Sequence, residues 1–215
     1  MRYHLIGSTS LLNRCAEYLI NNDLEVVGIC SEDNAIQELC KKNRIKYSSN
    51  QNEMIETDYD VLLSVVNFQV LQDQAIRKAN LYAINYHDSL LPSYAGINAA
   101  TWAIYNGEQQ HGATWHHIVK KIDGGDIIRQ GFIPIEENET SFSLNIKCQN
   151  LGFDLFKKII DSLVKEEKLE GNTQNFNKRS YFPLHKKFPY FSIINLFDSA
   201  YQVERMYRAS NFGPS

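Results

Sequence analysis

The 215-residue sequence contains no run that approaches the roughly 20 consecutive apolar residues a helix needs to cross a bilayer. Its N-terminus also lacks the long apolar stretch and small-residue cleavage site of a signal peptide. Hydrophobic residues make up 43% and charged residues 22% of the chain, values of ordinary globular proteins rather than of disordered chains or coiled coils. We therefore expect a folded, water-soluble, cytoplasmic protein.

A basic surface is missing as well. The chain has 22 Lys and Arg against 25 Asp and Glu, which gives a net charge of -3, and it has no long basic run. A protein that grips duplex nucleic acid needs many cationic side chains to neutralise phosphates. The composition therefore disfavours a nucleic-acid partner, although it is compatible with a local basic patch around one substrate.

Metal and dinucleotide motifs are also absent. The four cysteines are widely spaced and form no CxxC pair, which favours buried, reduced thiols over disulfides or a zinc site. They are Cys15, Cys30, Cys40 and Cys148. His116 and His117 have no HExxH-like spacing, and we interpret them as alternating core and surface positions of a strand. We therefore expect no bound metal. The turn at Gly7 lacks GxGxxG, so we also expect no nicotinamide dinucleotide.

What the first ninety residues do contain is an alternation of strand and helix patterns. Strands are predicted at residues 1–6, 25–30, 61–66 and 82–86, and helices at residues 11–20, 35–42 and 72–79. Residues 61–66 (VLLSVV) are apolar on both faces, as in a central parallel strand covered by helices. The pattern predicts an α/β fold with a Rossmann-like, doubly wound, mostly parallel sheet.

The second half of the chain continues differently. A helix is predicted at residues 98–105, two strands at residues 111–119 and 126–135, and one long helix or two abutting ones at residues 140–165. From Gly171 the sequence turns polar and then aromatic, and we interpret the aromatic cluster at residues 181–191 as the packing of a small subdomain. We place a catalytic domain at residues 1–178, and a linker with the start of a C-terminal subdomain at residues 179–215. The end at Ser215 suggests a piece of a longer polypeptide with further domains.

Two segments carry residues suited to chemistry. Asn85 and His87 lie two residues apart at the end of a predicted strand, so their side chains leave the same face of the sheet. In open α/β sheets this carboxyl end is where ligands bind. Asp123 precedes two glycines at a tight turn, where the backbone can approach another group closely. Around one pocket, His87 would exchange a proton, Asp123 would raise the pKa of His87, and the Asn85 amide would donate to an oxyanion.

This set suits acyl or formyl transfer to an amine. The sequence has no serine in a nucleophile elbow and no thiol near His87, so direct attack by the acceptor is simpler than a covalent enzyme intermediate.

The order and spacing of these motifs resemble the 10-formyltetrahydrofolate-dependent formyltransferases over about residues 1–170. The matching elements are Asn85-x-His87-x-Ser89-Leu90-Leu91-Pro92, Gly96, Gly107-Glu108 and Asp123-x-Gly125-x-Ile127. The resemblance implies that Asn85 polarises the formyl carbonyl and stabilises the oxyanion, and that His87 shuttles the proton. Asp123 would raise the pKa of His87 and order the reacting water or amine.

The resemblance also implies 10-formyltetrahydrofolate as the co-substrate and no metal. The folate would lie along three loops and be bonded mainly by backbone groups. The implied contacts are Gln69, Val70, Leu71, Ser89, Leu90, Leu91, Pro92, Val119, Lys120, Lys121 and Ile122.

The acceptor is where the sequence departs from parts of the family. Methionyl-tRNA and several sugar formyltransferases have an arginine after the motif glycine, whereas Ile97 follows Gly96 here. Residues 5–19, 115–127 and 208–215 are more similar to the formylation domains of nonribosomal peptide synthetases. We therefore expect an aminoacyl group on a carrier protein as the acceptor, with a nucleotide-linked amino sugar as the alternative.

Other activities stay open. Methionyl-tRNA formylation is disfavoured by the charge balance and Ile97. Formyltetrahydrofolate hydrolases use the same three residues with water, but they usually carry an additional N-terminal regulatory domain, so the start of this chain favours transfer. A catalytically idle folate-binding module is disfavoured because all three residues are present.

Overall fold

A seven-stranded sheet forms the centre of the computed structural model, which describes residues 1–186 and 197–212. The strand order is β3-β2-β1-β4-β5-β7-β8. The strands are β1 (Arg2–Gly7), β2 (Glu25–Cys30), β3 (Lys46–Ser48), β4 (Tyr59–Val65), β5 (Ala79–His87), β7 (Gln110–His117) and β8 (Ile127–Pro134). Strands β1 to β5 pair in parallel, and β7 and β8 complete the sheet as antiparallel neighbours. The predicted doubly wound, mostly parallel sheet is confirmed.

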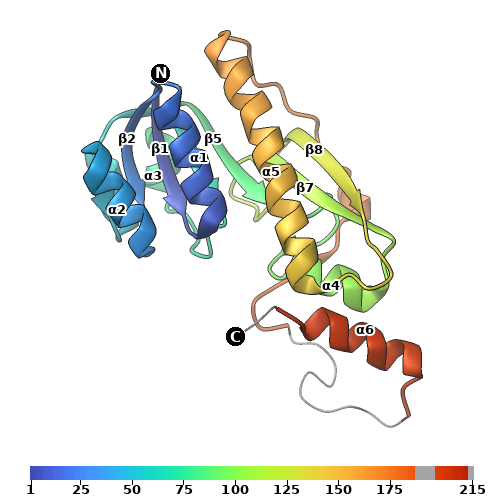
Figure 1. The fold of residues 1–215 in the computed structure, drawn as a ribbon. Coiled ribbons are helices and arrows are strands. Elements are labelled where there is room, and N and C mark those ends of the chain that lie inside the picture. The colour runs from blue at the N-terminus through green and yellow to red at the C-terminus, as the bar shows by residue number, and fades with distance from the viewer. Residues whose placement is uncertain (187–196, 213–215) are drawn as a thin grey trace.

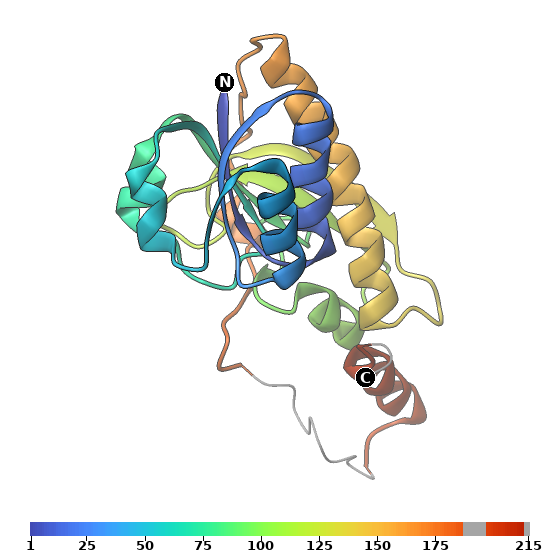
Figure 2. The same cartoon turned by 60° about the vertical axis from the view of Figure 1, so that its left-hand side comes forward.

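Helices cover both faces of this sheet (Figures 1 and 2). Helices α1 (Thr9–Asn21), α2 (Asn34–Asn43) and α5 (Ser141–Val164) lie on one face, and α3 (Asp73–Lys78) lies on the other. Helices α4 (Ala99–Asn106) and α6 (Ala200–Ser210) pack together beyond one end of the sheet. Within the described residues, no helix is both long and apolar enough to span a membrane.

Most predicted elements are present, with shifts at their ends. Strand β5 is longer than predicted, so that His87 is its last residue. Helix α5 is a single helix, and a reciprocal pair of hydrogen bonds between Thr140 and Ser143 caps its N-terminus. The short strand β3 and the 3-10 helix Gln51–Glu56 were not predicted, because such short segments show no hydrophobic periodicity.

The main core lies between the sheet and the α1, α2 and α5 face. Its largest fully buried side chains include Trp115, Tyr3, Phe156, Leu5 and Leu11. All four cysteines are buried and free, as predicted. Burial raises the pKa of Cys40 to about 11, so this thiol is inert at neutral pH.

The chain beyond residue 178 runs back to the segment just after β5 and packs against it. Strand β9 (Tyr181–Phe182) pairs in parallel with β6 (Ala95–Gly96). The Phe182 ring lies 5.3 Å from the Tyr94 ring and 4.6 Å from the Trp102 ring, measured between centroids. The aromatic residues Phe188, Tyr190 and Phe191 of the predicted cluster lie outside the described residues. The boundary at residue 178 stays a prediction.

Candidate active site

Asn85 and His87 lie where β5 ends, between parallel β4 and antiparallel β7. The pairing of β5 with β7 places His116 directly opposite Asn85. Directly paired residues of an antiparallel ladder project from the same face. The Asn85 Nδ2 atom lies 3.2 Å from Nε2 of His116.

Asp123 reaches this cluster from the loop at residues 118–126. Its φ of +49° is a left-handed conformation that aspartate tolerates better than most residues. Two residues later, a Cβ on Gly125 would lie 1.8 Å from the His117 carbonyl oxygen, so only glycine allows the loop to close this tightly. The turn carries the carboxylate of Asp123 toward β5, where one oxygen accepts a hydrogen bond from the Gly96 amide at 2.8 Å.

The three predicted catalytic residues are therefore brought together. Asp123 Oδ2 lies 3.9 Å from His87 Nδ1, and Asp123 Oδ1 lies 3.5 Å from His116 Nε2. His116 lies 3.2 Å from the Asn85 amide, so Asp123 and His116 connect Asn85 with His87. The arrangement places a largely buried carboxylate between two imidazoles, one from β5 and one from β7.

The orientation of His87 determines which nitrogen exchanges a proton. Its Nε2 lies 2.8 Å from the Tyr94 carbonyl oxygen, which can only accept, so Nε2 donates. In the neutral ring Nδ1 is then the basic nitrogen. It faces Asp123 at 3.9 Å and Asp88 at 3.8 Å.

The electrostatics of this pair favour an imidazolium beside a carboxylate. Burial lowers the pKa of His87, but the charges of Asp123 and Asp88 and the bond to Tyr94 outweigh it, so its pKa is raised. For Asp123, burial acts to raise the pKa, but His87, His116 and the Gly96 amide hold it well below the usual range. Asp123 therefore stays charged, and its charge favours the protonated form of His87.

Two residues of the cluster were missed by the sequence analysis. His116 was interpreted only as an alternating strand position; it is 2% exposed, but its ring contacts both Asn85 and Asp123. Asp88 supplies a second carboxylate near His87. No sequence signal marked His116, because its contact with Asn85 depends on the pairing of β5 with β7 and its contact with Asp123 depends on how the loop after β7 folds back.

The predicted folate contacts fall into two groups. Ser89 and Leu91 are buried, and the Ser89 hydroxyl donates to the Ser93 carbonyl while the Ser89 carbonyl accepts from Thr114. Leu90 and Pro92 are half-buried, and Leu71 packs against a small core cluster. The other predicted residues, Gln69, Val70, Val119, Lys120, Lys121 and Ile122, are mostly exposed loop residues. Their role in binding stays a prediction.

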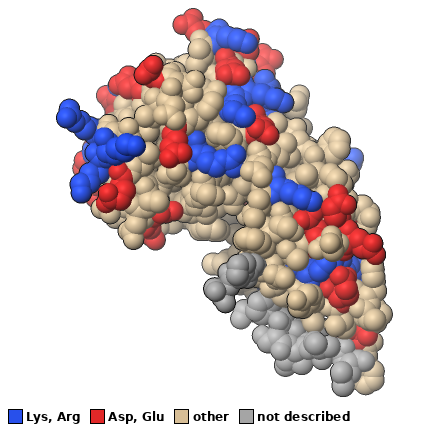
Figure 3. Space-filling model, viewed as in Figure 1, with Lys and Arg blue, Asp and Glu red and all other residues tan. Residues whose placement is uncertain are grey.

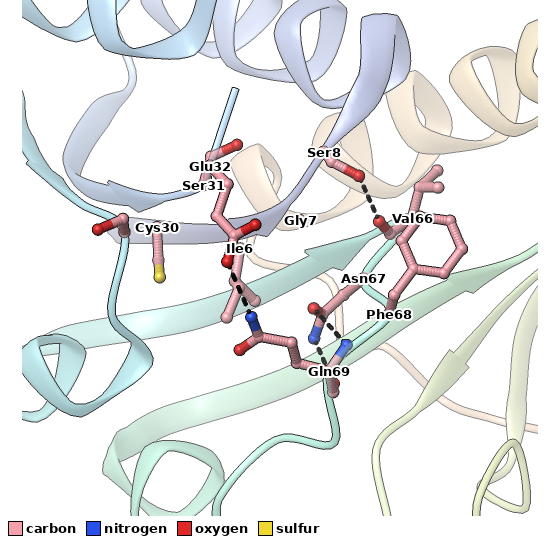
Figure 4. Close-up of a pocket in the computed structure, with 11 residues that line it drawn as sticks. Ile6, Gly7, Ser8, Cys30, Ser31, Glu32, Val66, Asn67, Phe68 and Gln69 are labelled. Carbon is pink, nitrogen blue, oxygen red and sulfur yellow. Dashed lines mark hydrogen bonds between the residues drawn. The ribbon is translucent and has the colours of Figure 1, made fainter. Parts of the chain in front are cut away.

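A separate hollow lies at the carboxyl ends of β1, β2 and β4 (Figure 4). It encloses about 430 Å³ of space open to solvent and is lined by Ile6, Gly7, Ser8, Cys30, Ser31, Glu32, Ser49, Val66, Asn67, Phe68 and Gln69. Gln69 donates to Glu32 at 3.3 Å, and the backbone amide of Gln69 bonds the Asn67 side chain. Gln69 is the only predicted folate contact that lines this hollow. None of Asn85, His87 and Asp123 lines it, so the hollow is distinct from the cluster around His87.

Comparison with known proteins agrees with this geometry. The family model described as Formyl transferase matches residues 17–160, and the chain belongs to this family. The bifunctional polymyxin resistance protein ArnA of Wigglesworthia glossinidia brevipalpis is 30% identical over 226 residues, which cover 96% of this chain. The methionyl-tRNA formyltransferase of Clostridioides difficile (strain 630) is 26% identical over 235 residues, which cover the whole chain. The chain spans 33% of the length of the first relative and 75% of the second.

A solved structure shares the fold. The N-formyltransferase from Helicobacter canadensis, determined in complex with folinic acid and dTDP-3-aminofucose, superimposes with a TM-score of 0.83. The match has 24% sequence identity and covers 97% of this chain and 80% of the other.

Proposed function

We propose that the protein is an N-formyltransferase that moves the formyl group of 10-formyltetrahydrofolate to a primary amine. The observation that carries the proposal is the cluster of Asn85, His87 and Asp123, in which Nε2 of His87 is held by a carbonyl and Nδ1 faces carboxylates. Membership of the formyltransferase family and the folinic acid in the Helicobacter canadensis structure support the same reaction and donor.

The donor would supply an activated formyl group, and the chain would manage the proton. The amine nitrogen attacks the formyl carbon, the bond from that carbon to N10 of the folate breaks, and the proton lost by the amine ends on N10. His87 Nδ1 is placed to carry this proton, because Asp123 and Asp88 stabilise its charged form.

Asn85 is the candidate donor to the developing oxyanion. Its Nδ2 already donates to the Tyr86 carbonyl at 2.9 Å and lies 3.2 Å from His116 Nε2. The Asn85 amide nitrogen therefore already has two protein groups within hydrogen-bond distance. To stabilise the oxyanion, Asn85 would exchange its contact with His116 for one with the formyl oxygen.

The loops predicted to hold the folate have the surface such a ligand needs. Val70 is 77% exposed, and Val119 and Ile122 are each 46% exposed. Large apolar side chains gathered on loops near polar catalytic groups are characteristic of binding surfaces. A pteridine and its aromatic linker would cover these side chains, while the loop backbone would supply hydrogen bonds.

Two acceptors are supported by different observations. A nucleotide-linked amino sugar is supported by the Helicobacter canadensis relative, whose structure contains dTDP-3-aminofucose. An aminoacyl group on a carrier protein is supported by Ile97 and by the similarity to peptide-synthetase formylation domains. A tRNA acceptor has less support, because acidic and basic side chains are mixed over the face in Figure 3 and no continuous basic surface spans it.

One assay compares these acceptors. Wild-type protein and His87→Ala would be incubated with 10-formyltetrahydrofolate and, separately, an aminoacyl carrier protein, a dTDP-amino sugar or methionyl-tRNA, with formylated product measured by mass spectrometry. We expect product with one of the first two and none with His87→Ala. Efficient formylation of methionyl-tRNA alone would move the assignment to the tRNA enzymes, and formate release without any acceptor would identify a hydrolase.

A further inference from the structure

We propose that Arg179 and Gln174, which belong to residues 172–182, here called the strap, are positioning residues that hold Asp123 against His87. The inference rests on the proposed function, since it concerns the same reacting cluster. The strap follows α5 in the chain and runs back past β8 toward α4 (Figure 1). Its contacts fall into two sets, one to the Asp123 loop and one to the groups that Asp123 and His87 bond.

The first set fixes the backbone of the loop that carries Asp123. Arg179 Nη2 donates to the Ile122 carbonyl at 2.7 Å, and Nη1 donates to the Asp123 carbonyl at 3.4 Å. Gln174 Nε2 donates to the Asp123 carbonyl at 2.9 Å and to the Gly125 carbonyl at 2.6 Å. Two strap side chains therefore donate hydrogen bonds to three backbone carbonyls of one turn, those of Ile122, Asp123 and Gly125. Gln174 is only 5% exposed, so its amide is held in place by the surrounding protein.

The second set fixes the hydrogen-bond partners of Asp123 and His87. The Gly96 amide, which donates to Asp123, belongs to a segment paired with Phe182 of the strap, and the Ile97 amide donates to the Phe182 carbonyl at 2.9 Å. This pairing requires glycine, because a Cβ at Gly96 would lie 2.2 Å from the Phe182 carbonyl oxygen. The same strap thus holds both the loop of Asp123 and the amide that its carboxylate bonds.

The strap reaches His87 in the same indirect way. The Ser180 hydroxyl accepts from the Tyr94 amide at 2.7 Å, and the Tyr94 carbonyl accepts from His87 at 2.8 Å. Tyr94 is also stacked on Phe182. The backbone group that selects the His87 tautomer is therefore held between two strap residues.

The strap therefore controls the distance between Asp123 and His87, although it does not contact the reacting atoms of either side chain. The loop at residues 118–126 exposes Val119, Lys120, Lys121 and Ile122, so it has little packing of its own. Without Arg179, the Ile122 carbonyl loses the donor that ties it to the strap. A shift of about 1 Å in a catalytic group can lower turnover by about 100-fold.

The test compares Arg179→Ala and Arg179→Lys with Lys178→Ala. Lys178 is the matched control, because it is an exposed cation one residue away whose side chain makes none of these bonds. We expect Arg179→Ala to lower kcat by about 10- to 100-fold. Arg179→Lys, which can still donate to one carbonyl, should recover part of kcat, and Lys178→Ala should match wild type.

A second readout does not need activity. Amide hydrogen exchange at residues 120–125 should be faster in Arg179→Ala than in wild type, and unchanged in Lys178→Ala. A kcat within about twofold of wild type, or unchanged exchange in this loop, would overturn the positioning role. Wild-type protein that transfers no formyl group would instead contradict the proposed function, and the exchange comparison would still decide whether the strap holds the loop.

Discussion

At the scale of single residues, the site depends on neighbours that change what a side chain can do. His87 would be an ordinary buried histidine with a lowered pKa if burial acted alone. Asp123 and Asp88 reverse that direction, and the Tyr94 carbonyl decides which nitrogen carries the fixed proton. Four groups therefore determine the chemistry of His87, namely its own ring, Asp123, Asp88 and the Tyr94 carbonyl.

Replacing Asp123 with asparagine tests this dependence. We expect Asp123→Asn to lower turnover by about 100-fold or more, because general acid-base catalysis of this kind contributes about 10²- to 10⁴-fold. The acid limb of kcat/KM against pH reports the loss of neutral His87. Removing a nearby negative charge lowers the pKa of His87, so this limb should move to lower pH. A limb that stays in place or moves to higher pH would contradict the assignment.

The same pair should behave as one unit. We expect His87→Ala combined with Asp123→Asn to be about as inactive as His87→Ala alone, since Asp123 acts through His87. Losses that multiply would show that the two residues act independently.

His4 offers a prediction about stability rather than activity. Burial lowers the pKa of His4 to about 4, whereas the unfolded chain binds the proton at an ordinary pKa of about 6.5. Between these values the unfolded state binds more protons, so the free energy of unfolding should fall as pH drops from about 6.5 to about 4, by up to about 3 kcal/mol. Urea unfolding across this range would measure the slope.

His4→Gln is the variant that checks the cause. It should make the dependence of unfolding free energy on pH between about 4 and 6.5 less steep, with a remainder from His111, whose pKa is also lowered by burial. His185→Gln provides the control, because His185 is exposed and should leave the slope unchanged. A wild-type slope that persists in His4→Gln would assign the acid sensitivity to another group.

At the scale of elements, α5 packs closely against the two strands, β5 and β7, that carry site residues. Its Gly152 lies against Tyr86 of β5, and the Gly152 carbonyl accepts a hydrogen bond from the Trp115 indole at 2.8 Å. A Cβ at position 152 would lie 2.3 Å from a ring carbon of Tyr86. The missing side chain lets the helix approach the strand that ends in His87.

Gly152→Ala therefore sets two effects against each other. Helix propensity favours alanine by about 1 kcal/mol, but overpacking a well-filled contact costs about 1–3 kcal/mol. Because Tyr86 is buried and its ring cannot move into solvent, we expect net destabilisation in chemical denaturation. Lys158→Ala on the exposed face of α5 should change stability by less than about 0.5 kcal/mol. Net stabilisation by Gly152→Ala would show that the helix can move away from β5.

At the scale of the whole molecule, binding of a reduced folate should stabilise the protein. A ligand at 100 times its dissociation constant adds about 2.7 kcal/mol, which for a chain of this size raises Tm by about 5–10 °C. We expect such a shift with 5-formyltetrahydrofolate, a stable mimic of the donor, and none with NAD. The thermal-shift measurement needs no acceptor.

Variants of the predicted folate surface make this measurement specific. Val119→Glu should reduce the shift, because an exposed apolar contact is replaced by a charge. Leu81→Glu is the matched control, since Leu81 is also exposed, at 56%, near the opposite end of β5 from His87. An equal loss of shift in both variants, or no shift in wild type at saturating ligand, would contradict the proposed folate site.

The sequence by itself determined the order of elements and the identity of the three central residues. Hydrophobic periodicity is local, so it predicts strands such as β4 and helices such as α5 without any knowledge of their packing. The motifs around His87 and Asp123 likewise stand out because each is a short run of unusual residues. Whether the predicted folate residues bind folate stays a prediction.

Only the tertiary structure decided which other residues join the site. His116 meets Asn85 because β7 pairs antiparallel with β5, and Arg179 meets the Asp123 loop 56 residues away in sequence. Neither contact leaves a periodic or motif-like trace, since hydrogen bonds from a side chain to a distant carbonyl impose no pattern on the intervening chain. The sequence analysis therefore gave residues 179–182 no part in the site, whereas Arg179 bonds the Asp123 loop and Tyr181 and Phe182 pair with Ala95 and Gly96.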